Sequence, residues 1–113
     1  MAPSKIRTRT LSDLRKTFLA MMSPQWDMAL DGKSDKEVTK AARALLAVQR
    51  ARLRLGNAQL ADIRDGLKAN EAQLAAGGRK LTGALDSLRN VNVVLGATSA
   101  LLRTVARVVD IVV

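Results

Sequence analysis

Leucine occupies every seventh position of residues 46–102, which read LAVQRARLRLGNAQLADIRDGLKANEAQLAAGGRKLTGALDSLRNVNVVLGATSALL. The nine leucines of this series are Leu46, Leu53, Leu60, Leu67, Leu74, Leu81, Leu88, Leu95 and Leu102. A seven-residue spacing forms one stripe only on a helix, so the pattern predicts a long coiled-coil-type helix. We expect these leucines, continued by Val105, to form an interface with other helices.

The course of this long helix has two interpretations. An unbroken helix over the leucine series would be about 85 Å long at about 1.5 Å per residue, so it would need partners along its length. The adjacent Gly77 and Gly78 offer a break, because two glycines cost a helix interior about 2 kcal/mol relative to alanine. A hairpin at this pair is therefore the alternative to a continuous or bent helix. The leucine phase continues unchanged across the pair, which favours the continuous or bent form.

The composition indicates an all-α chain with a single core. The 113 residues are 48% hydrophobic but only 2% aromatic, which is typical of helix bundles and coiled coils. Cysteine and histidine are both absent, and most zinc sites and nucleophile–histidine catalytic sites require one of them. We therefore expect no catalytic residue, no metal site and no cofactor, and hence a protein that is not an enzyme.

The chain before the leucine series is predicted to start with a flexible arm. Residues 1–9, MAPSKIRTR, are basic and show no helical apolar period. Residues 10–33 are expected to form short helices, the first capped by Thr10 or Ser12. This start lacks a secretory signal pattern, which favours a cytoplasmic or membrane-associated protein.

Two serines mark further helix starts. Ser23 precedes Pro24, an arrangement typical of a helix N-terminus, and we expect Trp26 to anchor this short helix onto the long one. Ser34 and Glu37 have the spacing of a reciprocal capping box, so the long helix should begin at Asp35. The coiled-coil-type segment is thus expected over residues 34–113.

The last part of this segment, residues 91–113, is strongly apolar. A helix that is apolar nearly all round must be covered, so we expect it to be buried between protein helices. Contact with a membrane surface is an alternative, and a membrane span is a third. Arg103, Arg107 and Asp110 make the span costly, at about 2.5 to 3.5 kcal/mol for each charge at the bilayer centre.

Positive charge is concentrated in two regions of a chain whose net charge is +9. The arm carries Lys5, Arg7 and Arg9, and residues 38–61 contain five basic residues and no acid. Arg43, Arg50 and Arg54 of this second region fall beside the leucine stripe on a helix. We expect these six residues, Lys5, Arg7, Arg9, Arg43, Arg50 and Arg54, to contact an anionic partner.

The sequence leaves three functional hypotheses. The first is a non-catalytic structural or interaction protein that self-assembles, or binds partner helices, through the leucine stripe and the apolar C-terminal helix. The second is a membrane-associated amphipathic protein that uses its positive charge on an anionic surface. The third, nucleic-acid binding, has less support because no aromatic residue alternates with the basic ones for base stacking.

Overall fold

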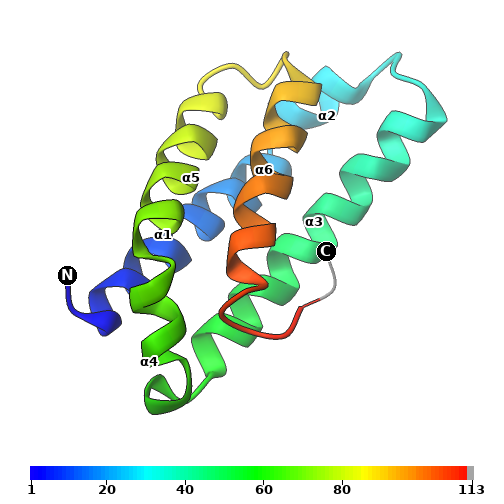
Figure 1. Ribbon diagram of the computed structural model, residues 1–113. Helices are drawn as coiled ribbons and strands as arrows, with labels where there is room; N and C mark the ends of the chain where they lie inside the picture. The colour runs from blue at the N-terminus through cyan, green and yellow to red at the C-terminus, as the bar shows by residue number, and fades with distance from the viewer. Residues whose placement is uncertain (112–113) are drawn as a thin grey trace.

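Six α-helices make up the secondary structure of residues 1–111, the part of the chain that the computed structural model describes (Figure 1). They are α1 (Pro3–Met21), α2 (Pro24–Leu30), α3 (Asp35–Asn57), α4 (Leu60–Ala69), α5 (Glu71–Ala84) and α6 (Val91–Val105). These residues contain no β-strand, so the all-α class predicted from the sequence is confirmed.

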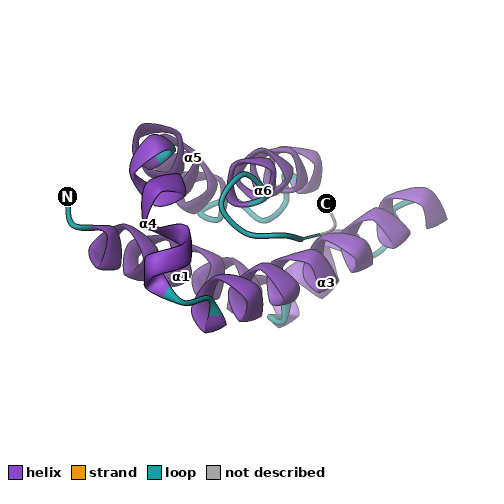
Figure 2. Ribbon diagram, turned by 60° about the horizontal axis from the view of Figure 1, so that its bottom comes forward, coloured by secondary structure: helices purple, strands orange, loops and turns teal. Residues whose placement is uncertain are grey.

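The helices form a two-layered antiparallel bundle. One layer consists of α1 and α3, and the other consists of α4, α5 and α6 (Figure 2). Helix α1 also packs against α4 and α5, and α3 packs against α6, which closes the bundle around one core. The molecule measures 45 × 23 × 18 Å, so it is far shorter than a continuous leucine helix would be.

The predicted long helix is wrong in both of its forms. The chain leaves the helical conformation at Ala58 and Gln59, which are extended with ψ of 143° and 129°, and it turns again between residues 85 and 90. A further break at Asn70 separates α4 from α5, and the Asn70 side chain donates a hydrogen bond to the carbonyl of Gly66 at 2.9 Å. Folding back at these points lets the leucines pack against the chain's own helices, whereas a single rod would leave them exposed.

The glycine pair does not form a hairpin loop. Gly77 and Gly78 both lie inside α5, where Gly78 is buried and Gly77 is half-buried against Leu101 of α6. Glycine at these positions allows close approach of the neighbouring helices, which outweighs its low helix propensity.

The predicted flexible arm is a helix. Helix α1 begins at Pro3, because proline is pre-organised for the first helical position, and neither Thr10 nor Ser12 caps it. Its inward face consists of Ile6, Thr10, Leu14, Thr17 and Met21. The hydroxyls of both threonines donate to the carbonyls four residues earlier, at 3.0 and 2.9 Å, so they are buried without an unpaired polar group.

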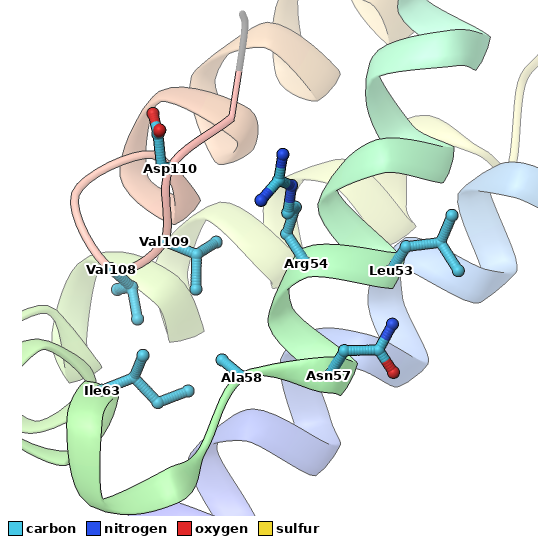
Figure 3. Close-up of a pocket in the computed structure, with 8 residues that line it drawn as sticks. All are labelled: Leu53, Arg54, Asn57, Ala58, Ile63, Val108, Val109 and Asp110. Carbon is cyan, nitrogen blue, oxygen red and sulfur yellow. The ribbon is translucent and has the colours of Figure 1, made fainter.

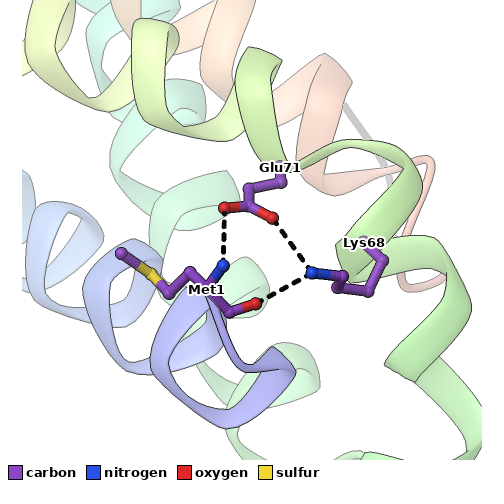
Figure 4. Close-up of polar contacts among 3 residues, drawn as sticks. All are labelled: Met1, Lys68 and Glu71. Atoms are coloured by element: carbon purple, nitrogen blue, oxygen red, sulfur yellow. Dashed lines mark hydrogen bonds and ion pairs between the residues drawn. The ribbon is translucent and has the colours of Figure 1, made fainter.

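The first residue is also held in place (Figure 4). The amino group of Met1 lies 3.4 Å from a carboxylate oxygen of Glu71, and Lys68 Nζ donates to the Met1 carbonyl at 3.0 Å. Desolvation raises the pKa of Glu71, but the hydrogen bonds and charges of the Met1 ammonium and of Lys68 outweigh it and lower the pKa overall.

The two predicted serine caps are confirmed. Ser23 Oγ accepts from the backbone N–H of Trp26, and the Trp26 side chain is buried in the core. Ser34 Oγ accepts from the N–H of Glu37 at 3.2 Å, and the Glu37 carboxylate accepts in return from the N–H of Ser34. Helix α3 therefore begins at Asp35, as the sequence indicates.

The apolar C-terminal segment is helical only as far as Val105. Helix α6 buries eight residues between α3 and α5, and the chain then turns through residues 106–111. The expected helix over 106–111 is therefore wrong, and positions 112 and 113 lie outside the described residues. No helix within residues 1–111 is long and apolar enough to cross a bilayer.

Candidate helix-docking surface

Helix α3 presents two opposite faces, and only one of them belongs to the core. Its inward face consists of Ala41, Val48, Ala51 and Leu55, which are all buried. Leu46 and Leu53 each stand two residues before a residue of that row, so they lie about 160° around the helix from it. Their exposed fractions are 48% and 57%.

The rest of the leucine series is covered within the chain. Leu67, Leu74, Leu81, Leu95, Leu102 and the following Val105 are buried, and Leu60 and Leu88 are half-buried. The leucines of the seven-residue series thus point into the core from α4, α5 and α6 but toward the outside from α3. Of the ten residues predicted to form an interface, only Leu46 and Leu53 remain substantially exposed in the folded chain.

Three arginines run beside the exposed leucines. Arg43, Arg50 and Arg54 are exposed on α3, and none of them forms an ion pair with a carboxylate among the described residues. Residues 38–61 contain no acid, so carboxylates near these arginines come from outside this stretch: Asp35 lines a hollow with Arg43, and Asp110 lines one with Arg54. We call Leu46, Leu53, Arg43, Arg50 and Arg54 the outer face of α3.

The basic residues near the N-terminus are arranged differently. Lys5 is exposed, but Arg7 donates to the carbonyl of Ala58 at 2.8 Å and so ties α1 to the end of α3. Arg9 is half-buried, and its Nε and Nη2 atoms are enclosed with no hydrogen-bond partner among residues 1–111. Arg7 and Arg9 are therefore engaged with the bundle, while Lys5 remains accessible.

A groove of about 440 Å³ lies beside the outer face, between α1 and α3. Leu11 of α1 and Leu53 and Gly56 of α3 line it with apolar surface, and Arg15 and Arg52 supply one positive charge from each helix. The Arg52 guanidinium lies 4.9 Å from the centre of the Phe18 ring, a cation–π contact that holds it against α1. We call this hollow the α1–α3 groove.

A second hollow, of about 590 Å³, opens where the C-terminal turn passes the end of α3 (Figure 3). Its apolar lining comes from Leu53, Ile63, Val108 and Val109, and Arg54 and Asp110 are its charged residues. Leu53 lines both hollows and so separates them.

The sequence indicates part of this surface and misses the rest. Helical spacing predicts that the leucines and arginines of the outer face lie side by side, and the structure places them so. The groove is not predicted, because Leu11 and Arg15 lie more than thirty residues from their α3 neighbours in the sequence. Only the absence of acid over residues 38–61 hints at a wider basic surface.

Within residues 1–111 no three potential metal ligands lie together. A two-helix surface with apolar ridges and arginine margins is suited chemically to binding another chain. Comparison with protein families, curated proteins and solved structures finds no match to this chain.

Proposed function

We propose that this protein is a non-catalytic interaction protein that binds an acidic amphipathic helix of a partner across the outer face of α3. One observation carries the proposal. Leu46 and Leu53 are exposed on a regular helix while most of the leucine series is buried in the bundle. Exposed leucines in register on one helix face are the usual anchor for a partner helix.

The charge beside these leucines favours an acidic partner. Arg43, Arg50 and Arg54 lack carboxylate partners among the described residues, so glutamates or aspartates flanking the apolar stripe of a docked helix can pair with them. Such pairs at the margin of an interface mainly raise the association rate and exclude wrong partners. Affinity would come from covering Leu46 and Leu53.

Self-association through this face is less favourable. A symmetric dimer places the same surface of each copy against the other, so the arginines of both chains would approach one another. The net charge of +9 adds repulsion between copies. A homo-oligomer built on the whole leucine series would also require the buried leucines of α4, α5 and α6 to leave the core.

The proposal is tested with a probe peptide, a synthetic helix with leucines at heptad spacing and glutamates on both sides of them. Fluorescence anisotropy measures its affinity for the wild-type protein, for Leu46→Gln and for Leu19→Gln. Leu19 is the matched control, because it is 55% exposed on α1 and lines neither hollow. We expect Leu46→Gln to weaken binding about tenfold, which corresponds to about 1.4 kcal/mol, and Leu19→Gln to leave it unchanged.

Two results would contradict the proposal. One is the absence of binding to the probe peptide, and the other is equal binding of a peptide with lysine in place of every glutamate. An anionic bilayer also suits arginines beside exposed leucines, so flotation with vesicles of anionic lipid is measured in parallel. Flotation that depends on Leu46 without any binding of the peptide would assign the surface to lipid instead.

Nucleic acid has the least support as a partner. Base stacking requires an accessible aromatic ring, but Trp26 is buried and Phe18 is half-buried with Arg52 over its ring. These are the chain's only aromatic residues.

A further inference from the structure

The α1–α3 groove is open along the apolar ridge that α3 offers to a partner. Leu53 belongs both to the outer face and to the wall of the groove, so the two surfaces are continuous. The volume of about 440 Å³ lies in the range of about 300–1,000 Å³ found for small-molecule pockets, so the groove has ample room for one side chain. A helix lying on Leu46 and Leu53 would therefore pass beside an open recess, whose apolar side chains are Leu11 and Leu53 and whose other side chains are polar or charged.

The charge of the groove restricts what can enter it. Arg15 and Arg52 lie on opposite helices, and no acid is among the residues that line the groove. Neither arginine forms an ion pair with a carboxylate among residues 1–111. An apolar group flanked by carboxylates is complementary to this arrangement, because the apolar part covers Leu11 and Leu53 while the carboxylates meet the two guanidinium groups.

We propose that the α1–α3 groove receives one large apolar side chain of the docked acidic helix, and that Arg15 and Arg52 bind carboxylates on either side of that side chain. This inference rests on the proposed function and assigns it a specificity site. Side chains of one helix inserting between those of two others is the ordinary mode of helix packing. The Leu46–Leu53 spacing of about 10.5 Å along the axis matches one heptad of such a partner.

Gly56 provides the means to test the groove without disturbing the core. A Cβ at position 56 would meet only Leu11 Cδ2, at 3.9 Å, which is an ordinary van der Waals contact. Alanine therefore fits at this position and also raises helix propensity, whereas leucine would project into the groove. Gly56→Leu is the blocking variant, and Gly56→Ala is its matched control.

The experiment is a double-mutant cycle between the protein and the probe peptide. Each peptide leucine is replaced by alanine in turn, and affinity is measured for wild type, Gly56→Ala and Gly56→Leu. In wild type and Gly56→Ala, we expect one leucine truncation to cost about tenfold in affinity. In Gly56→Leu, full-length peptide should bind about tenfold more weakly, and the same truncation should cost less than about twofold.

A second pair of variants decides the matter if circular dichroism shows that Gly56→Leu does not fold. Arg15→Glu reverses a charge that lines the groove, and Lys16→Glu makes the same change at an exposed residue that does not line it. We expect Arg15→Glu to weaken binding about tenfold and Lys16→Glu to weaken it less than about threefold. Equal effects of these two variants would contradict the groove site, as would a Gly56→Leu protein that folds and binds every peptide as wild type does.

The two proposals fail in different ways. If Leu46→Gln weakens binding while Gly56→Leu and Arg15→Glu do not, the outer face binds the helix and the groove assignment is wrong. If the probe peptide does not bind wild-type protein at all, the proposed function fails and the groove assignment fails with it.

Discussion

The carboxylate of Asp13 on α1 lies directly against Gly78 on α5. A Cβ at position 78 would fall 3.1 Å from Asp13 Cγ and closer still to Oδ2, so any larger residue at this position requires the Asp13 side chain to move. The contact explains why a residue without a side chain stands at this position of α5, despite the low helix propensity of glycine. It also places a carboxyl group at the crossing of two helices, where burial raises its pKa, although the charges of Lys16 and Arg9 oppose this.

Gly78→Ala is expected to destabilise the protein. The added methyl group displaces the Asp13 carboxylate, which stands at the end of a side chain that can rotate. The cost should therefore lie near the low end of the about 1–3 kcal/mol that is typical of overpacking, and alanine's better helix propensity partly offsets it. Gly96→Ala is the control, because a Cβ added at Gly96 inside α6 would have no neighbouring atom within 4 Å. This control should stabilise the fold by about 0.5–1 kcal/mol. Urea unfolding of both variants measures the difference.

In a protein that carries Asp13→Ala, the further change Gly78→Ala should no longer be destabilising. With the carboxylate removed, Gly78→Ala no longer meets it, so the double variant should be more stable than the sum of the single changes predicts. Strict additivity of the two changes would show that the Asp13–Gly78 contact has no energetic consequence.

The raised pKa of Asp13 predicts a specific pH dependence of stability. Between the unfolded-state pKa of about 3.8 and the higher folded-state pKa, the folded protein holds the proton more tightly, so this group's contribution to the unfolding free energy falls as pH rises. At neutral pH the buried carboxylate is therefore destabilising. Asp13→Asn should be more stable than wild type at pH 7, and the advantage should shrink as pH falls through this window. An advantage of equal size at low and neutral pH would point to packing rather than to ionisation.

Substitutions along the leucine series should divide into two classes. Leu67 and Leu81 are fully buried, so replacing either with alanine should cost about 2–5 kcal/mol. Leu46→Ala and Leu53→Ala change exposed side chains and should stay within about 0.5 kcal/mol of wild type. Chemical unfolding of the four variants tests this. A uniform cost along the series would mean that all the leucines share one environment, as they would in a continuous coiled coil.

The sequence predicts helix starts well where a side chain forms a local hydrogen bond. Ser23 and Ser34 are recognisable as caps, because their partners lie three residues away. The start of α1 is harder to recognise because its first turns bury only Ile6 and Thr10, and Thr10 buries its hydroxyl by bonding within the helix and so does not resemble a core residue. The seven-residue spacing of the leucines is misleading for a different reason. The spacing continues unchanged across the helix breaks at Gln59 and Asn70, and neither position is a glycine or a proline that would predict a helix end.

The outer face of α3 can be recognised from the sequence, but the α1–α3 groove beside it cannot. Helical periodicity alone brings Leu46 and Leu53 beside Arg43, Arg50 and Arg54. The groove depends on the pairing of α1 with α3, which places Arg15 opposite Arg52. Local pattern carries no information about that pairing, since it is set by the packing of the whole bundle.

The leucines of α4, α5 and α6 are covered within one chain, so the protein should fold without a second copy. Light scattering combined with thermal unfolding over about a hundredfold range of protein concentration tests it most directly, because a melting midpoint that depends on concentration indicates an obligate oligomer. We expect a molar mass of 12.2 kDa and a midpoint that does not change with concentration. A multiple of that mass, with a midpoint that rises with concentration, would show that the leucine stripe is completed by a second chain and would contradict the account.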